Sequence, residues 1–74
     1  MTTSLCTIAT DVIEEDATAA IHVLGFDGHV AWMERNPIDR YKDGLRYKVW
    51  SVKAHLPVHK VDAIKKAIIV SCLK

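Results

Sequence analysis

The residues able to perform covalent or acid–base chemistry show no catalytic spacing. The thiols, Cys6 and Cys72, lie near opposite ends of the 74 residues, and neither stands beside a histidine at a motif spacing. A nucleophile needs a neighbouring base and a scaffold that holds both in place. The three glycines form no phosphate-binding loop, and a chain of this size offers little concave surface. We therefore expect no catalytic residue, no cofactor and no small-molecule substrate, and an enzyme is the least supported class of function.

The four histidines include two pairs that could be considered as metal ligands. His55 and His59 stand four residues apart, which brings two imidazoles to one face of a helix, but Pro57 between them disrupts that geometry. His22 and His29 would approach each other only across a hairpin. Neither pair has companion cysteines at zinc-finger spacing. We therefore expect hydrogen-bonded or surface histidines and no metal site.

Positive charge is concentrated in the second part of the chain, although the net charge is only +1. Residues 1–28 contain five acids and no Lys or Arg, whereas residues 29–74 contain all ten Lys and Arg and four acids. Such asymmetry favours an anionic partner, or a contact between the acidic part of one copy and the basic part of another. Charge alone therefore leaves both nucleic acid and a second copy of the chain open as partners.

A basic sheet makes nucleic-acid binding the alternative function. Tyr41, Tyr47 and Trp50 are interleaved with cations, which could contact phosphates while the aromatic rings stack on unpaired bases. The candidate contacts are Arg35, Arg40, Lys42, Arg46, Lys48 and Lys53. Two observations oppose this hypothesis. Asp39 and Asp43 interrupt the basic run, and the isoelectric point of about 7.8 is below the value of about 9 typical of dedicated modules.

Apolar residues make up half of the chain, which is typical of a folded domain. Because a core this small contributes only about 3–5 kcal/mol, we expect some apolar surface to remain for contact with a second molecule. The candidate interface residues are Trp32, Trp50, Ile69, Val70 and Leu73. The leading hypothesis is a small non-catalytic protein that acts through protein–protein contacts and forms a homodimer. A regulator or inhibitor of phage or mobile-element type fits this description.

The cysteine content and the N-terminus favour a cytoplasmic single domain over residues 1–74. Two cysteines are fewer than a secreted disulfide scaffold needs, so we expect free, buried thiols. Residues 1–6 lack the basic start and apolar run of a signal peptide, and the longest apolar stretch, residues 67–70, is too short to span a bilayer. A membrane is therefore not an expected partner.

The expected fold is α+β, with a three- to four-stranded antiparallel sheet and a C-terminal helix packed on one face. Residues 5–13 are expected to form the first strand, and the acids at 14–16 a turn. The Asp27-Gly28 pair between apolar residues favours a type I′ turn, and hence a hairpin over residues 20–34.

A helix over residues 12–24 is the alternative for the same segment. Asp11 could cap it and Gly25 could end it. One face of this helix would carry the apolar stripe Ile13, Ala17, Ala20, Ile21 and Leu24. The two alternatives agree on a strand after Gly28.

The second part of the chain is expected to contain a loop, a long strand and a helix. Residues 36–44, which include Pro37 and a second Asp-Gly pair, predict the loop. Residues 45–56 predict a strand whose apolar phase changes at Val49-Trp50, which indicates a bulge. The helix after it would bury Val61, Ile64, Ala67, Ile68 and Ser71. Its end is apolar on all sides, and this pattern predicts contact with a partner.

Overall fold

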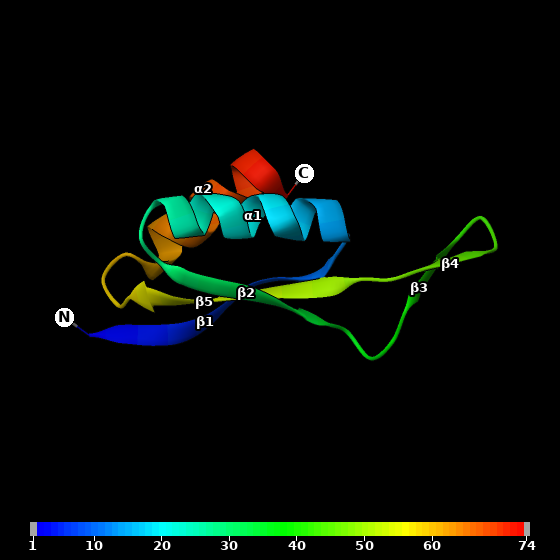
Figure 1. Ribbon diagram of the computed structural model, residues 1–74, viewed down its shortest axis with the longest axis horizontal. Helices are drawn as coiled ribbons and strands as arrows, with labels where there is room; N and C mark the ends of the chain where they lie inside the picture. Colours follow the sequence, from blue (N-terminus) through cyan, green and yellow to red (C-terminus); the bar gives the residue numbers. More distant parts are fainter. Residues whose placement is uncertain (1, 74) are drawn as a thin grey trace.

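A computed structural model describes residues 2–73 of the chain, which fold into five strands and two helices. In chain order the elements are β1 (Thr3–Val12), α1 (Glu14–Phe26), β2 (Val30–Arg35), β3 (Arg40–Lys42), β4 (Leu45–Tyr47), β5 (Trp50–Pro57) and α2 (Val61–Cys72). β1, β5 and β2 form an antiparallel sheet in that spatial order, and both helices cover the same face of it (Figure 1). The α+β fold, the antiparallel sheet and the C-terminal helix on one face are confirmed.

The segment that ends at Asp27-Gly28 is helical, so the hairpin expected over residues 20–34 is wrong and the alternative N-terminal helix is confirmed. Gly28 has the positive φ (87°) that a type I′ turn would need. The His29 N–H donates to the Leu24 carbonyl (2.9 Å), and the Gly28 N–H donates to the Gly25 carbonyl (3.0 Å), which is a Schellman motif. The Asp-Gly pair misled the prediction because a helix end and a type I′ turn select glycine for the same backbone conformation.

The acidic residues at 14–16, expected to form a turn, are the first turn of α1. Negative charge there is favourable because the helix N-terminus carries partial positive charge. The helix starts after Ile13 and not at Asp11, the expected cap. Asp11 instead has a φ of 57° near the end of β1, where the pairing with β5 is irregular. Asp11 therefore lies at an irregular position of β1, with a positive φ, and is not part of the helix.

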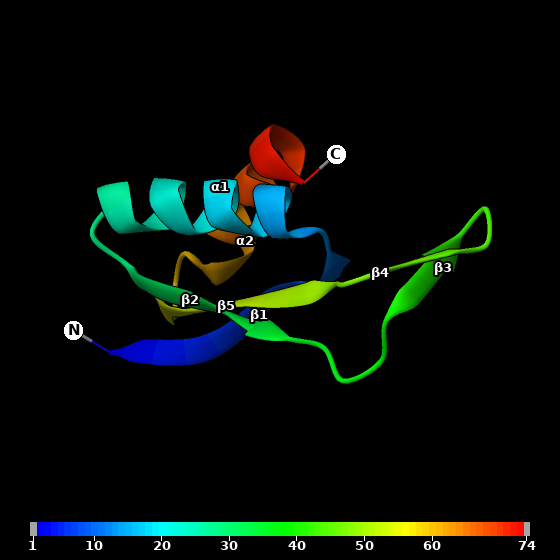
Figure 2. The same ribbon diagram turned by 45° about the vertical axis from the view of Figure 1, so that its right-hand side comes forward.

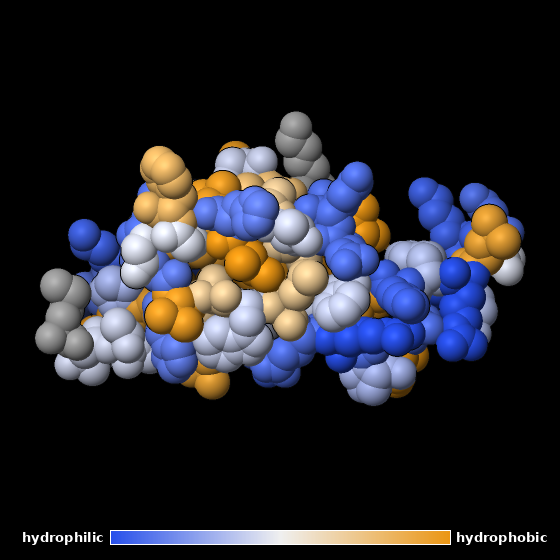
Figure 3. Space-filling model, in the orientation of Figure 1, coloured by the Kyte–Doolittle hydropathy of each residue, from blue (hydrophilic) through white to orange (hydrophobic). Residues whose placement is uncertain are grey.

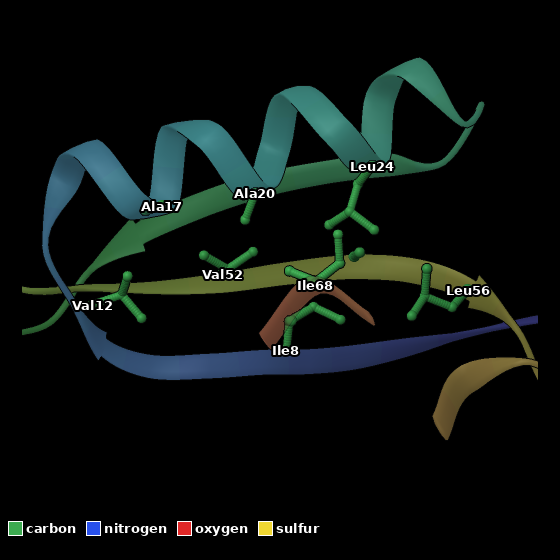
Figure 4. Close-up of a cluster of buried hydrophobic side chains, with 9 residues drawn as sticks. Ile8, Val12, Ala17, Ala20, Leu24, Val52, Leu56 and Ile68 are labelled. Atoms are coloured by element: carbon green, nitrogen blue, oxygen red, sulfur yellow. The ribbon is translucent and has the colours of Figure 1, made fainter. Parts of the chain in front are cut away.

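One hydrophobic core fills the space between the sheet and the two helices (Figure 4). From α1, the side chains of Ala17, Ala20 and Leu24 are buried toward the sheet, as the helical alternative predicts. The buried cluster consists of Ile8, Val12, Ala17, Ala20, Leu24, Val52, Ala54, Leu56 and Ile68. Cys6 and Cys72 are free and half-buried at its margin. The core therefore lies entirely on the helix-covered side of the sheet.

α2 contributes to this core through only part of the predicted stripe. Ile68 is buried, and Val61 and Ile64 are half-buried against the cluster. Ala67 and Ser71, expected on the same face, are exposed, and the Ser71 hydroxyl donates to the Ala67 carbonyl (2.7 Å). α2 therefore packs on β1 and α1 through a narrower stripe than its periodicity predicts. Neither helix of residues 2–73 is long and apolar enough to cross a membrane.

β3 and β4 form a two-stranded ribbon that projects from one end of the body (Figures 1 and 2). Asp43 and Gly44 join them with φ values of 53° and 77°, which is the geometry of a type I′ turn. The loop expected over residues 36–44 is thus wrong at 40–42, which are extended and paired. The long strand expected over residues 45–56 is interrupted at 48–49, at the predicted phase change.

We call residues 36–48 the β-arm. It makes the molecule elongated, with extents of 46 × 22 × 18 Å. At its base, the Asn36 N–H donates to the Val49 carbonyl (3.0 Å), and the Val49 side chain is fully buried. The β-arm is thus anchored at its base and continues the direction of β2 and β5 away from the body.

Candidate functional site

The face of the sheet without helices presents a surface of mixed apolar and polar side chains, which we call the open face. Alternation along the strands places it opposite the buried residues of β5. It comprises Thr3, Leu5 and Thr7 of β1, Val30, Trp32 and Glu34 of β2, and Ser51, Lys53, His55 and Pro57 of β5. Leu5, His55 and Val30 are paired across the three strands in one row, and Leu5 and Val30 are 59% and 64% exposed. Two large aliphatic side chains therefore flank a histidine on the open face.

Trp32 is the aromatic residue of the open face, and its neighbours hold it in one orientation. Its ring lies 5.4 Å from the His55 ring, and its Nε1 donates to Glu34 Oε2 (2.8 Å). Lys53 Nζ donates to the other carboxylate oxygen of Glu34 (3.2 Å). The hydrogen bonds from Trp32 and then from Lys53 hold the pKa of Glu34 below its ordinary value. Glu34 therefore keeps its charge and fixes a half-buried indole beside exposed aliphatic groups.

A polar network joins the β-arm to the body. The Asp11 carboxylate accepts hydrogen bonds from Asn36 Nδ2 (3.0 Å) and Arg40 Nη2 (2.6 Å), and Asn36 Oδ1 accepts one from the Ser51 hydroxyl (2.6 Å). Asp11 has a left-handed backbone, a conformation that Asp adopts more readily than most residues other than Gly. The network therefore links the end of β1 to both sides of the base of the β-arm.

Asp39 is the second anion that organises the β-arm. Arg46 Nε donates to one of its carboxylate oxygens (2.7 Å) and Arg35 Nη2 to the other (3.3 Å). Its side chain is 10% exposed. The hydrogen bond from Arg46 is the largest influence on the pKa of Asp39, which lies below its ordinary value. Asp39 is thus an anion at neutral pH that neutralises part of the positive charge of the β-arm.

The structure places five of the six candidate nucleic-acid contacts on the β-arm or at its base, and one elsewhere. Arg35, Arg40 and Arg46 are engaged by Asp39 or Asp11. Lys53 lies on the open face, paired with Glu34. Among residues 2–73, Lys42 and Lys48 are the two candidates without an ion-pair partner. Figure 3 shows the β-arm as mostly hydrophilic, with a hydrophobic patch at its far end, where Leu45 is 73% exposed.

The five candidate interface residues do not form one surface. Trp32 is on the open face, whereas Trp50 packs against the core, where its Nε1 is buried with no acceptor among residues 2–73. Ile69 and Val70 are exposed on α2, and Leu73 is half-buried at its end. They therefore divide among the open face, the core and α2.

Several exposed apolar residues were missed by the sequence analysis. Leu5 and Val30 belong to the same row of the sheet, but the incorrect hairpin paired Val30 with α1 residues and gave no partner to Leu5. Phe26, 93% exposed at the end of α1, was assigned to that hairpin too. Only the long-range pairing of β1 with β5 reveals the open face. No local signal in the sequence could have found it.

A groove of about 610 Å³ lies where the end of β1, the start of α1 and the end of α2 meet. We call it the acidic groove; it is lined by Ile8, Ala9, Thr10, Asp11, Val12, Ile13, Asp16, Ile69 and Leu73. Two of these residues are acids and none is a cation. Ile69 and Leu73, two of the predicted interface residues, form part of its apolar wall.

Within residues 2–73, no three His, Cys, Asp or Glu side chains gather as a metal site would require. Comparison with protein-family models, curated proteins and solved structures finds no match to this chain. Its function must therefore be argued from these surfaces alone.

Proposed function

We propose that this chain is a non-catalytic protein-binding domain that contacts its partner through the open face. The row of Leu5, His55 and Val30, with Trp32 beside it, supports this function more than any other observation. A domain this small would bury these aliphatic side chains under a helix if they served only its own stability. A regulator or inhibitor that covers the surface of another protein would use them in this way.

The energetics of the open face suit a protein contact. Complete burial of an exposed Leu or Val contributes about 1.5–3 kcal/mol, and Leu5 and Val30 retain more than half of their exposure. Trp32 is fixed by Glu34 before binding, so a partner would immobilise little additional side-chain freedom. The ion pair Lys53–Glu34 lies beside the apolar row, with Lys53 on the central strand opposite Trp32, and protein interfaces commonly combine apolar contacts with polar ones. We expect the partner to present a flat apolar surface.

Affinity capture from the native host tests this function. The wild-type chain is compared with the double variant Leu5→Ser, Val30→Ser and with Phe26→Ser. Phe26 is the matched control because it is apolar and strongly exposed but lies on α1. We expect a protein that the wild type and Phe26→Ser retain and that the open-face variant loses. If all three chains retain the same proteins, or none retains any, the open face is not a binding surface.

Nucleic-acid binding by the β-arm is the second candidate function. Lys42 and Lys48, which have no ion-pair partner among residues 2–73, lie beside Tyr41 and Tyr47 on the projecting ribbon. Cations would neutralise phosphates and the tyrosines would stack on unpaired bases.

Fluorescence polarisation with a labelled single-stranded oligonucleotide tests the second candidate. It predicts an affinity that falls steeply with salt, and a salt slope reduced by about 1 in Lys48→Ala. Arg46→Ala should weaken binding less, because Asp39 already engages Arg46. No retention of DNA or RNA at low salt would eliminate this candidate.

We further propose that the chain acts in the cytoplasm. The low cysteine content and the two free thiols support this location, because thiols remain reduced there.

A further inference from the structure

We propose that the chain forms a two-fold dimer by exchange of β-arms, in which the tip of each β-arm lies in the acidic groove of the other copy. This inference goes beyond the binding function proposed above, because it uses neither the open face nor any of its residues. It commits to one occupant of the groove, a second copy of this chain.

The β-arm lacks apolar support within one copy of the chain. A two-stranded ribbon alone is marginally stable in water, and this one contacts the body only near its base. Its apolar side chains Ile38, Tyr41 and Leu45 are all exposed. A ribbon that is extended and apolar at its tip gains stability when a second surface covers it.

The pairing of β3 with β4 determines which side chains can enter a groove together. Lys42 is directly opposite Leu45, so both project from the same face of the ribbon. Tyr41 and Arg46 form the next pair and project from the other face. One face of the tip therefore combines an exposed aliphatic side chain with a cation that has no ion-pair partner among residues 2–73.

The acidic groove has the complementary chemistry. Its apolar lining includes Ile13 and Ile69, both exposed, and half-buried Leu73. Asp16, in the first turn of α1, lies in the same lining. Residues 1–28 carry no Lys or Arg. Leu45 would contact the isoleucines while Lys42 approaches Asp16, whereas a nucleic-acid phosphate would be repelled from this groove.

The position of the groove permits a closed, reciprocal dimer. Asp11 lines the groove and also binds Arg40, so the groove lies at the end of the body from which the β-arm projects. Two copies related by a two-fold axis beside this end would each place a β-arm over the groove of the other. From Arg40 to its tip the ribbon extends about 10 Å, at about 3.3 Å per residue, which is enough to cross a facing groove. A two-fold contact is self-complementary and closes, so it gives dimers and not filaments.

Sedimentation velocity across the micromolar range, with charge-reversed variants, tests the arm exchange. We expect the wild type to be dimeric, and Lys42→Glu and Asp16→Lys each to weaken the dimer at least about tenfold, because each places like charges together. An equimolar mixture of the two variants should recover a dimer, since each β-arm then meets a groove of opposite charge. The chain with both substitutions should recover it as well.

Matched variants separate the contact from effects on folding. Glu15→Lys makes the same charge change in the same helical turn as Asp16→Lys but lies outside the groove lining, so the dimer should persist. Leu45→Ser should weaken the dimer, whereas Tyr41→Ser, on the other face of the ribbon, should leave it intact. Circular dichroism should show the wild-type spectrum for each variant, which would establish that it is folded.

Any one of the following outcomes would overturn the arm exchange. The wild type could be a monomer throughout, the dimer could survive both charge reversals, or the mixture could fail to recover it. Loss of the dimer in the open-face variant Leu5→Ser, Val30→Ser would mean that copies associate through the open face instead. Because partner capture depends on the open face and the dimer on the β-arm, either proposal can fail while the other stands.

Discussion

At the scale of single residues, two carboxylates position side chains of the proposed binding surfaces. Glu34 fixes Trp32 on the open face, and Asp39 gathers two arginines at the β-arm. Both have a pKa below the ordinary value because cations or hydrogen-bond donors face them. The three ion pairs that they form are at the surface, where single pairs contribute little to global stability. Their effect is therefore local: they orient side chains that a partner would contact.

The order of the β-arm should depend on pH through Asp39. Its pKa is lower in the folded chain than the ordinary 3.8, so its ion pairs stabilise the folded arrangement fully above about that pH. The contribution is lost as the pH falls through the lower, folded-state pKa. Carboxyl-carbon NMR should show Asp39 titrating below 3.8, and the Arg46 Nε–H resonance should shift in the same pH range.

Asp39→Asn provides the control for that titration. The Arg46 Nε–H resonance should then no longer shift in that pH range. The body of the domain should remain folded because the core contains no residue of the β-arm. Two results would contradict the ion pair between Asp39 and Arg46 as the cause. One is a pKa of 3.8 or above for Asp39, and the other is a pH-dependent shift of the Arg46 Nε–H resonance that persists in Asp39→Asn.

At the scale of elements, the two Asp-Gly pairs show what the sequence could predict. Asp43-Gly44 makes the type I′ turn that this dipeptide favours, whereas Asp27-Gly28 follows a helix and ends it. What distinguishes them is the preceding segment: α1 offers alanines at helical spacing, and its burial depends on contact with β2, which follows it, and with the distant β5. Periodicity therefore identified both alternatives for residues 12–24, but tertiary packing decided between them.

The strand β5 was predicted more accurately because its pattern is local. Trp50, Val52, Ala54 and Leu56 alternate with polar residues, and this set faces the core as expected. The candidate functional surfaces could not be predicted equally well. The open face joins residues of β1 and β2 through β5, and the acidic groove joins β1 to α2. Such surfaces follow from pairings between distant segments, which a single sequence does not specify.

The end of α1 offers a test at this scale. Gly28→Ala should destabilise the domain by about 1 kcal/mol, because φ is 87° there and a side chain disfavours that conformation. No atom lies within 4 Å of the added Cβ, so the cost is conformational and not a clash. Thermal unfolding should show a midpoint lowered by about 4–8 °C.

Gly25→Ala is the matched control for this prediction. Gly25 is helical, and its added Cβ would also meet no atom within 4 Å, so alanine should stabilise the domain by about 0.5 kcal/mol. Opposite signs for two glycines three residues apart would confirm that Gly28 is required for its backbone conformation. A neutral Gly28→Ala would contradict the Schellman ending of α1.

At the scale of the whole molecule, the core and the proposed binding surfaces lie in different parts of the chain. The core residues lie in the body, between the helices and one face of the sheet. The open face and the β-arm add exposed apolar groups and charge but contribute no member of the core. This separation explains why so small a domain can present two independent surfaces: changes at either one leave the packing that folds the chain intact.

Removal of the β-arm tests this division of roles. Asn36 and Val49 are joined by a backbone hydrogen bond, so the two-residue turn Asn-Gly can replace residues 37–48 and connect β2 to β5 directly. We expect cooperative unfolding with a loss of less than about 1 kcal/mol, measured by urea unfolding at a concentration where the intact chain is monomeric. The shortened chain should remain a monomer at every concentration and should still retain the open-face partner. Loss of cooperative unfolding would show that the β-arm supports the core, because the body could then not fold without residues that the structure places outside it.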